Sequence, residues 1–286
     1  MPSLPPYATT GVGSLPHADP VAAVRHVLRA YELPFCPQLP RAEGDMVREW
    51  LGGEPPACGW SPDRDRERPV AWDAFVAAVR AAPPAHGLVK LQVTGPATLA
   101  TALEGPGDAG LAREIATWLA ANAAGQVRRL REAGLGVVLL VDEPDLASAG
   151  IGDPDVWGPL RLTGADAWGL HVCGRVPWAL VDTLGPGVVS FDLARHGLGG
   201  DGAVVLRRVV ERGGRIAWGA LDPVAPAAAP AAAARMAAAV DSLGLPAGQV
   251  AASSLLTPGC GTGLLTVADE ELLAARLSSL RPSPRG

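Results

Sequence analysis

Two residue types that bind soft metal ions stand two positions apart, at His171 and Cys173. On a β-strand this spacing points both side chains to the same side, so the imidazole and the thiolate could hold one ion together. Taken alone, such a pair is more typical of a packed cysteine beside a hydrogen-bonded histidine. A second thiol strengthens the metal interpretation, because Cys260 lies in a Pro-Gly-Cys-Gly turn whose glycines let the backbone approach an ion closely.

A fourth ligand is available at Asp192, which follows a short apolar run. Two sulfurs, one nitrogen and one carboxylate oxygen favour tetrahedral zinc over magnesium or calcium. We therefore predict a Zn²⁺ site formed by His171, Cys173, Asp192 and Cys260. An incoming thiol could bind such an ion and be held as a thiolate at neutral pH.

Other polar side chains that end apolar runs are candidates for substrate contacts or catalysis. Asp142 and Glu143 follow Gly-Val-Val-Leu-Leu-Val, and a carboxylate there could bind a cationic amine; the alternative is a helix cap or a salt bridge in a loop. Thr94 precedes Gly-Pro, which is equally typical of a substrate contact and of a strand-to-helix turn with proline at the first helical position. Ser14 and Asp222 end two further runs.

These polar residues belong to a repeated alternation of short apolar runs and longer helical stretches, which indicates βα units with parallel pairing. Eight runs are candidate strands: Ala8 to Ser14, Pro34 to Leu39, Leu88 to Val93, Gly136 to Val141, Trp168 to Cys173, Val188 to Asp192, Arg215 to Leu221 and Gln249 to Leu255. Seven stretches are expected helices: Pro20 to Ala30, Trp72 to Ala82, Gly110 to Ala133, Pro177 to Thr183, Ala203 to Arg212, Ala231 to Leu243 and Ala268 to Leu280.

Eight strand candidates in 286 residues predict one domain over residues 1–286, a single (β/α)8 TIM-type barrel. Such barrels typically take about 250 residues and place their chemistry at the C-terminal ends of the strands. An open doubly wound sheet is the weaker alternative. It would be expected to carry a Gly-x-Gly-x-x-Gly turn after its first strand and an acidic residue about 20 positions later, and no such turn follows the first expected strand, Ala8 to Ser14.

Composition narrows the class of protein. Hydrophobic residues make up 48% of the chain and charged residues 19%, so a large core can be buried. The 24 basic and 29 acidic side chains leave a net charge of −5, and Lys90 is the single lysine. This balance argues against a nucleic-acid-binding surface and against a polybasic membrane anchor. No apolar stretch reaches the roughly 18 residues of a membrane span, and the first residues lack the pattern of a secretion signal, so we expect a cytoplasmic protein.

Six short motifs occur in order along the chain: Thr9-Thr10-Gly11-Val12-Gly13-Ser14-Leu15-Pro16, Asp45-Met46-Val47 followed by Glu49, Val93-Thr94-Gly95-Pro96, Val141-Asp142-Glu143-Pro144, His171-Val172-Cys173 and Pro258-Gly259-Cys260-Gly261. Together they resemble the catalytic C-terminal barrel of the cobalamin-independent methionine synthases. Any one of these motifs is unremarkable, and their shared order makes the match specific.

The resemblance implies a zinc ion that activates the thiol of homocysteine, held at the positions of the four candidate ligands. It also implies contacts to the amino-acid end of the substrate. Val12, Gly13 and Ser14 correspond to residues near the carboxylate, and Asp142 corresponds to the residue at the ammonium group. Glu49 corresponds to a further glutamate of the family.

The chain departs from the family pattern in three ways, and the first two bear on the methyl donor. The folate-dependent enzymes resemble two fused barrels, whereas this chain holds one, so a methyl-folate donor would lack part of its binding surface. Asp222 stands where the family commonly has a histidine that protonates the folate leaving group, and Asp192 stands where it usually has glutamate. Short single-barrel relatives suggest instead a methylated corrinoid, carried on a partner protein.

The resemblance therefore predicts a zinc-dependent S-methyltransferase that acts on a small thiol, with homocysteine as the preferred acceptor and a corrinoid or a folate as the donor. One alternative is a uroporphyrinogen decarboxylase-like barrel enzyme, which needs no zinc and would leave His171, Cys173 and Cys260 without a role. A second alternative is a zinc-holding protein that binds a thiol amino acid or a corrinoid partner without turnover.

Overall fold

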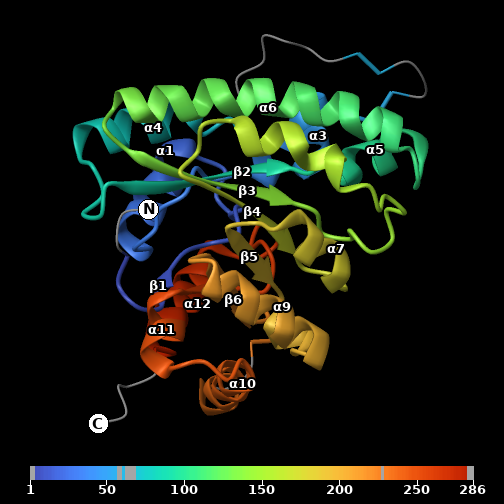
Figure 1. Cartoon of the computed structure of the whole chain (residues 1–286). Helices are drawn as coiled ribbons and strands as arrows, with labels where there is room; N and C mark the ends of the chain where they lie inside the picture. Colours follow the sequence, from blue (N-terminus) through green and yellow to red (C-terminus); the bar gives the residue numbers. More distant parts are fainter. Residues whose placement is uncertain (1–3, 57–59, 62–68, 227–228, 282–286) are drawn as a thin grey trace.

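The computed structural model describes residues 4–56, 60–61, 69–226 and 229–281. Its centre is a curled sheet of seven strands, paired in parallel in the order β1-β7-β6-β5-β4-β3-β2 (Figure 1). The strands are β1 (Ala8–Thr9), β2 (Leu88–Thr94), β3 (Gly136–Asp142), β4 (Ala167–Val172), β5 (Val188–Phe191), β6 (Arg215–Leu221) and β7 (Ser254–Pro258).

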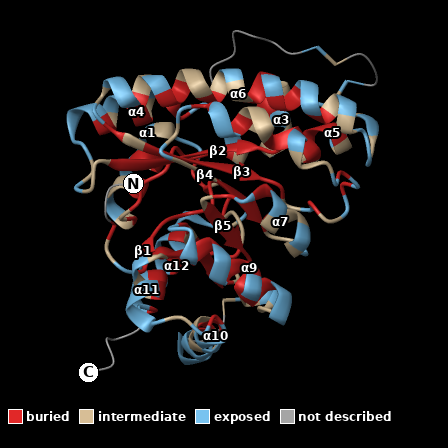
Figure 2. Ribbon diagram, in the orientation of Figure 1, coloured by how far each residue is buried: buried red, intermediate tan, exposed pale blue. Residues whose placement is uncertain are grey.

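Helices cover the outer face of the sheet. They are α1 (Pro20–Ala30), α2 (Pro40–Glu43), α3 (Met46–Leu51), α4 (Trp72–Ala81), α5 (Pro96–Glu104), α6 (Ala109–Glu132), α7 (Trp178–Leu184), α8 (Leu193–His196), α9 (Gly200–Glu211), α10 (Ala229–Ser242), α11 (Ala247–Ala252) and α12 (Val267–Ser279), with a 3-10 helix, η1, at Pro154–Leu162. All seven expected helices are present, as α1, α4, α6, α7, α9, α10 and α12. Figure 2 shows buried strands beneath helices that expose one side to solvent. Within the described ranges, no helix is both long and apolar enough to cross a membrane.

The two faces of the strands carry different side chains, because successive residues of a strand point in opposite directions. Outward-pointing residues such as Val89, Leu91 and Val93 of β2 pack with the helices in one large apolar core. Inward-pointing residues near the start of the strands, such as Leu88 and Val138, form a second and smaller core inside the curl. The base of the interior is therefore apolar.

Further along the strands, the inward positions become polar. Lys90, Gln92 and Thr94 follow one another on the inner face of β2, Asp142 ends β3, and His171 lies near the end of β4; all five are buried. This change from apolar to polar side chains occurs toward the C-terminal ends of the strands, the end at which barrel enzymes carry out their chemistry.

The prediction of eight strands is corrected by the structure. The expected second strand, Pro34 to Leu39, forms two isolated parallel bridges instead of a continuous ladder. One bridge joins Phe35 to Lys90 of β2, and the other joins Gln38 to Ser14. The described residues therefore form a seven-stranded curled sheet that is consistent with a TIM-like barrel, and they do not form a closed eight-stranded one.

Proline explains why this ladder is interrupted. Pro34, Pro37 and Pro40 lack the backbone N–H that a continuous ladder requires. The first strand is also shorter than expected: of the run Ala8 to Ser14, only Ala8–Thr9 pairs as a strand, with β7.

The last strand lies later in the chain than expected. The apolar content of the run Gln249 to Leu255 predicts a strand, but Ala247–Ala252 forms α11 and β7 begins at Ser254. Alanine and glutamine favour helix over strand, which accounts for the difference.

Glu143 anchors the start of α5. Its buried carboxylate accepts hydrogen bonds from the backbone N–H groups of Ala97 (3.0 Å) and Thr98 (2.9 Å), from the Thr98 hydroxyl (2.6 Å) and from the Trp157 indole (2.9 Å). A carboxylate at a helix N-terminus satisfies unpaired N–H groups and is stabilised by the helix dipole. The helix-cap interpretation thus applies to the second carboxylate of the Asp142-Glu143 pair.

Gly95 makes this arrangement possible, because a Cβ atom there would overlap the Glu143 carboxylate. We expect Gly95→Ala to lower the free energy of unfolding, measured in urea, by about 1–3 kcal/mol through overpacking. Gly125→Ala, within α6, is the matched control, since a Cβ at Gly125 meets nothing within 4 Å. It should raise the free energy of unfolding by about 0.5–1 kcal/mol. Equal effects of the two substitutions would contradict this account.

Lys90 lies inside the curl with 1% of its surface exposed. Its Nζ donates hydrogen bonds to the carbonyl oxygen of Val12 (2.6 Å) and to Oε1 of Gln92 (2.9 Å). Burial lowers the pKa of Lys90 from its usual 10.5 to about 8, although Asp142 and Cys36 oppose the shift.

In protein labelled with ¹⁵N-lysine, the single lysine should give one side-chain signal that titrates at a pKa of about 8 instead of 10.5. Between these values the unfolded chain holds the proton more tightly, so the titration of Lys90 makes the free energy of unfolding rise with pH. This rise should be absent in Lys90→Met, measured by urea unfolding across the same pH range. A titration at the usual pKa would contradict the burial of this ammonium.

Candidate metal centre

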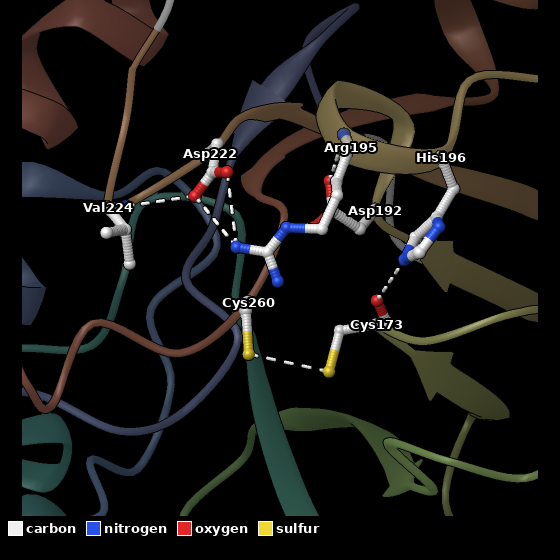
Figure 3. A network of polar contacts seen from close by, with 7 residues as sticks. All are labelled: Cys173, Asp192, Arg195, His196, Asp222, Val224 and Cys260. Atoms are coloured by element: carbon white, nitrogen blue, oxygen red, sulfur yellow. Dashed lines mark hydrogen bonds and ion pairs between the residues drawn. The ribbon is translucent and has the colours of Figure 1, made fainter.

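Three side chains that bind soft metal ions converge at the C-terminal end of the sheet. His171 lies near the end of β4, Cys173 follows β4 directly, and Cys260 lies in the turn after β7. One ligand atom from each lies within 4.8 Å of the other two. The two Sγ atoms are 3.4 Å apart (Figure 3). The structure thus brings together three of the four predicted zinc ligands.

The strand register explains the position of His171. Thr94 pairs with Asp142, Asp142 pairs with His171, and His171 pairs with Ser190, so four residues form one row across β2, β3, β4 and β5. Their side chains share the inner face of the sheet, because directly paired residues point to the same side.

The His171 ring is oriented by one nitrogen and leaves the other for a ligand. Nδ1 is 2.9 Å from the hydroxyl of Ser190. Nε2 is buried, and no hydrogen-bond partner for it lies in the described part of the chain. A buried nitrogen without a partner costs free energy. This nitrogen beside two sulfurs fits a zinc ion, and Ser190 holds the ring in the way that outer-sphere partners orient metal-binding histidines.

The two thiols are hydrogen-bonded to each other. Hydrogen bonding with Cys173 lowers the pKa of Cys260, and the His171 ring acts in the same direction, whereas burial opposes the shift. The same hydrogen bond, together with burial, raises the pKa of Cys173. A cluster that favours one thiolate provides the charged ligand that zinc prefers.

Asp192 is next to this cluster and is not part of the three-residue group. Its Oδ1 accepts a hydrogen bond from the Arg195 backbone N–H (2.8 Å) and so caps α8, and its Oδ2 lies 3.9 Å from Nε of the Arg195 side chain. It also packs closely against the turn that carries Cys260, because a Cβ at Gly259 would overlap its carboxylate. The role of Asp192 as a fourth ligand stays a prediction.

A cavity of about 270 Å³ opens onto the cluster. Its walls include all three cluster residues and four of the residues predicted to contact substrate, namely Val12, Ser14, Glu49 and Asp142. Five separate segments of the sequence, within residues 12–14, 38–49, 142–144, 171–173 and 260–264, therefore meet around one space.

Gly13 and Thr94 lie beside this cavity and support its walls. The carbonyl oxygen of Gly13 accepts a hydrogen bond from the Gln38 N–H (3.0 Å). The Thr94 hydroxyl donates to the carbonyl oxygen of Met46 (2.9 Å), the first residue of α3. This contact holds the helix that carries buried Glu49, so Thr94 acts on the cavity through α3. A direct substrate contact by either residue stays a prediction.

Asp142 is suited to bind a cation. Its carboxylate is buried in the cavity wall, and Oδ1 has no hydrogen-bond partner among the residues that the structure describes. Burial raises the pKa of Asp142 to about 6, although the neighbouring His171 and Lys90 oppose the shift. A buried carboxylate of this kind is stabilised by a cationic partner such as an ammonium group.

Asp222 lies in an ion pair near the cluster, outside the cavity wall. Nη2 of Arg195 is 3.2 Å from both carboxylate oxygens of Asp222, and the Val224 backbone N–H donates to Oδ1 (3.0 Å) (Figure 3). Burial raises the pKa of Asp222, but these two donors outweigh it and keep the pKa below its usual value. Asp222 is therefore ionised, and its predicted catalytic role stays a prediction.

Sequence reasoning missed two residues that shape the site. Ser190 lies on β5, two positions before Asp192, which follows the strand; the alternation of side chains along the expected strand Val188 to Asp192 could have identified it. Arg195 joins Asp192 to Asp222, which is 27 positions further along the chain. No local pattern predicts that second contact.

Comparison with known proteins supports the fold. No family model matches the chain, and no curated protein matches it significantly. Among solved structures, a B12-independent methionine synthase from Shewanella sp. W3-18-1, in complex with selenomethionine, aligns with a TM-score of 0.56 and 15% sequence identity. The alignment covers 75% of this chain and 66% of that one.

A methyltransferase from Methanosarcina mazei aligns with a TM-score of 0.52 and 15% identity, over 98% of this chain and 94% of that one. At these identities the likeness is one of fold. It supports a related barrel architecture for this chain, built as an α/β protein with a curled parallel sheet.

The cluster predicts a specific pattern of metal content. Protein purified under reducing conditions without a chelating column should carry roughly one zinc per chain by elemental analysis. His171→Ala and Cys260→Ala should each lose it, because three ligands are needed to hold the ion. Cys36→Ala is the matched control, since Cys36 is a buried free cysteine outside the cluster. Wild type that stays free of zinc after reconstitution would refute the site, as would equal loss in the control.

Proposed function

We propose that this chain is a zinc-dependent S-methyltransferase that methylates a small thiol, with homocysteine as the preferred acceptor and methionine as the product. The observation that carries this proposal is that the His171, Cys173 and Cys260 cluster and the buried carboxylate of Asp142 open into the same cavity. A substrate with a thiol at one end and an ammonium group at the other matches both features.

The size of the cavity supports a small substrate. At about 270 Å³ it lies below the range of about 300–1,000 Å³ typical of pockets for drug-sized ligands. The structure of the Shewanella protein of similar fold holds selenomethionine, which is close in size to methionine, the proposed product. We extend this chemistry to the present chain as part of the proposal.

In the proposed reaction, His171, Cys173 and Cys260 would hold the zinc ion, with Asp192 as a fourth ligand that the substrate thiol can replace. Bound zinc would lower the pKa of the substrate thiol and keep it as a thiolate near neutral pH. Asp142 and Glu49 orient the ammonium group, and the backbone of Val12, Gly13 and Ser14 faces the carboxylate.

This orientation directs the thiolate sulfur toward the methyl carbon of the donor. The sulfur–carbon bond forms as the bond between the methyl carbon and the donor breaks, and the electron pair of the broken bond stays with the donor. The thiol proton has already been released to water.

The surroundings of Asp222 bear on the donor. The ion pair with Arg195 keeps this carboxylate ionised, so it would have to lose that contact before it could protonate a leaving group. This favours a methylated corrinoid, delivered by a partner protein, over a methyl-folate. A reducing compartment suits the two close thiols, in line with the expected cytoplasmic location.

Methyl transfer tests the proposal directly. The zinc-loaded chain, given homocysteine and either methylcobalamin or methyltetrahydrofolate, should form methionine, detected by mass spectrometry. Asp142→Asn should lower kcat/KM roughly 10- to 150-fold, because a hydrogen bond to a charged group contributes about 1.5–3 kcal/mol. Its zinc content should be unchanged.

Asp201→Asn, an exposed position in the first turn of α9, is the matched control and should leave kcat/KM unchanged. Binding of homocysteine without methyl transfer from either donor would favour the non-catalytic zinc protein. Wild-type protein that neither holds zinc nor binds homocysteine would favour the decarboxylase-like alternative.

A further inference from the structure

Side-chain hydrogen bonds cross the region between β1 and β2, where the strand ladder is interrupted. Between β1 and β2 the described residues form two isolated bridges and no continuous ladder. Lys90 and Gln92, both on the inner face of β2, reach across this region. They are buried, and the mechanism above leaves both without a role.

Three hydrogen bonds make this connection. Nζ of Lys90 donates to the carbonyl oxygen of Val12 (2.6 Å) and to Oε1 of Gln92 (2.9 Å). Nε2 of Gln92 donates in turn to the carbonyl oxygen of Cys36 (2.5 Å). Lys90 and Gln92 of β2 thereby bind the backbones of two other segments. One of these is the turn formed by Val12, Gly13 and Ser14, which lies at the cavity.

The Val12–Ser14 turn is held from both ends by these and neighbouring contacts. Lys90 binds the carbonyl oxygen of Val12, while the carbonyl oxygen of Ser14 accepts hydrogen bonds from the N–H and the hydroxyl of Thr262, both at 3.0 Å. Gly13 fits closely between them, because a Cβ there would lie 2.9 Å from side-chain atoms of Gln38 and Gln92. Since Val12 and Ser14 line the cavity, a change at Lys90 is transmitted to its wall.

We propose that Lys90 is a positioning residue that holds the Val12–Ser14 turn in the orientation that receives the carboxylate end of the thiol substrate. The substrate part of this inference rests on the proposed function. The hold on the turn rests on the hydrogen bonds alone.

A purely stabilising role does not explain an ammonium group at this position. The hydrogen-bond acceptors of Lys90 are two neutral oxygens, and burial disfavours its charged form, a cost that the charge of Asp142 offsets only in part. Lys90→Met keeps a similar volume and removes this desolvation cost, but it leaves two buried acceptors unpaired, which costs free energy in turn. We expect Lys90→Met to keep the fold, which makes it a suitable test.

Amide hydrogen exchange on the zinc-loaded full chain tests the hold on the turn. The N–H of Leu15 donates to Gln38 (2.9 Å), and the N–H of Gln38 donates to Gly13 (3.0 Å), so both amides report on this segment. In Lys90→Met their exchange should be roughly tenfold faster or more, while amides of β3 and β4 stay at the wild-type rate. The matched control, Leu91→Ala, alters the outer face of the same strand and should lack this selective pattern.

Kinetics with two substrates test the effect on recognition. Homocysteine carries the carboxylate, and 3-mercaptopropylamine is the same molecule without it. In Lys90→Met the KM for homocysteine should rise about 10- to 100-fold, because small displacements of a positioning group have effects of this size. The KM for 3-mercaptopropylamine and the zinc content should stay unchanged.

Unchanged exchange at Leu15 and Gln38, or the same pattern in Leu91→Ala, would overturn the positioning role. An equal rise in KM for both thiols would also overturn it, since that result indicates general damage to the site. If wild type methylates neither thiol, the proposed function fails, and the exchange pattern then decides whether Lys90 holds the turn.

Discussion

The parallel pairing of the strands is the constraint on which the candidate site depends. Because β2 to β7 run in one direction, their C-terminal ends meet at one rim, and the register places Thr94, Asp142, His171 and Ser190 in a single row. A slip of one residue in β4 would turn His171 away from the interior and toward the helices. The cluster of His171, Cys173 and Cys260 and the carboxylate of Asp142 beside it therefore come together only in this register.

Burial then sets the chemistry of the polar groups at that rim. The apolar inner core closes the base of the interior, so charged groups above it are poorly solvated. This raises the pKa of Asp142 and lowers that of Lys90, and it leaves Nε2 of His171 with no hydrogen-bond partner in the described ranges. Such groups recover free energy when a ligand pairs with them, which favours a cation at both the sulfur cluster and the carboxylate.

Side-chain contacts complete the site where backbone ladders do not reach. Lys90 and Gln92 join segments across the interrupted edge of the sheet, Thr94 fixes the start of α3, and Arg195 links Asp192 to Asp222. Most of these contacts join a polar group to a backbone or an ion-pair partner far away in the sequence. Those of Lys90 and Thr94 hold segments that line the cavity.

By itself, the sequence determined the alternation of strands and helices, the candidate ligands and the polar ends of the strands, because these follow from local spacing and residue chemistry. Where local signals conflicted, prediction failed: prolines interrupted the expected strand Pro34 to Leu39, and an alanine-rich helix occupied the start of the expected run Gln249 to Leu255. Only the tertiary structure decided which groups meet. Cys173 and Cys260 lie 87 positions apart, and the curl of the sheet is what brings their sulfurs to 3.4 Å. The contacts of Lys90 with Val12 and of Arg195 with Asp222 likewise depend on long-range packing, which no local pattern encodes.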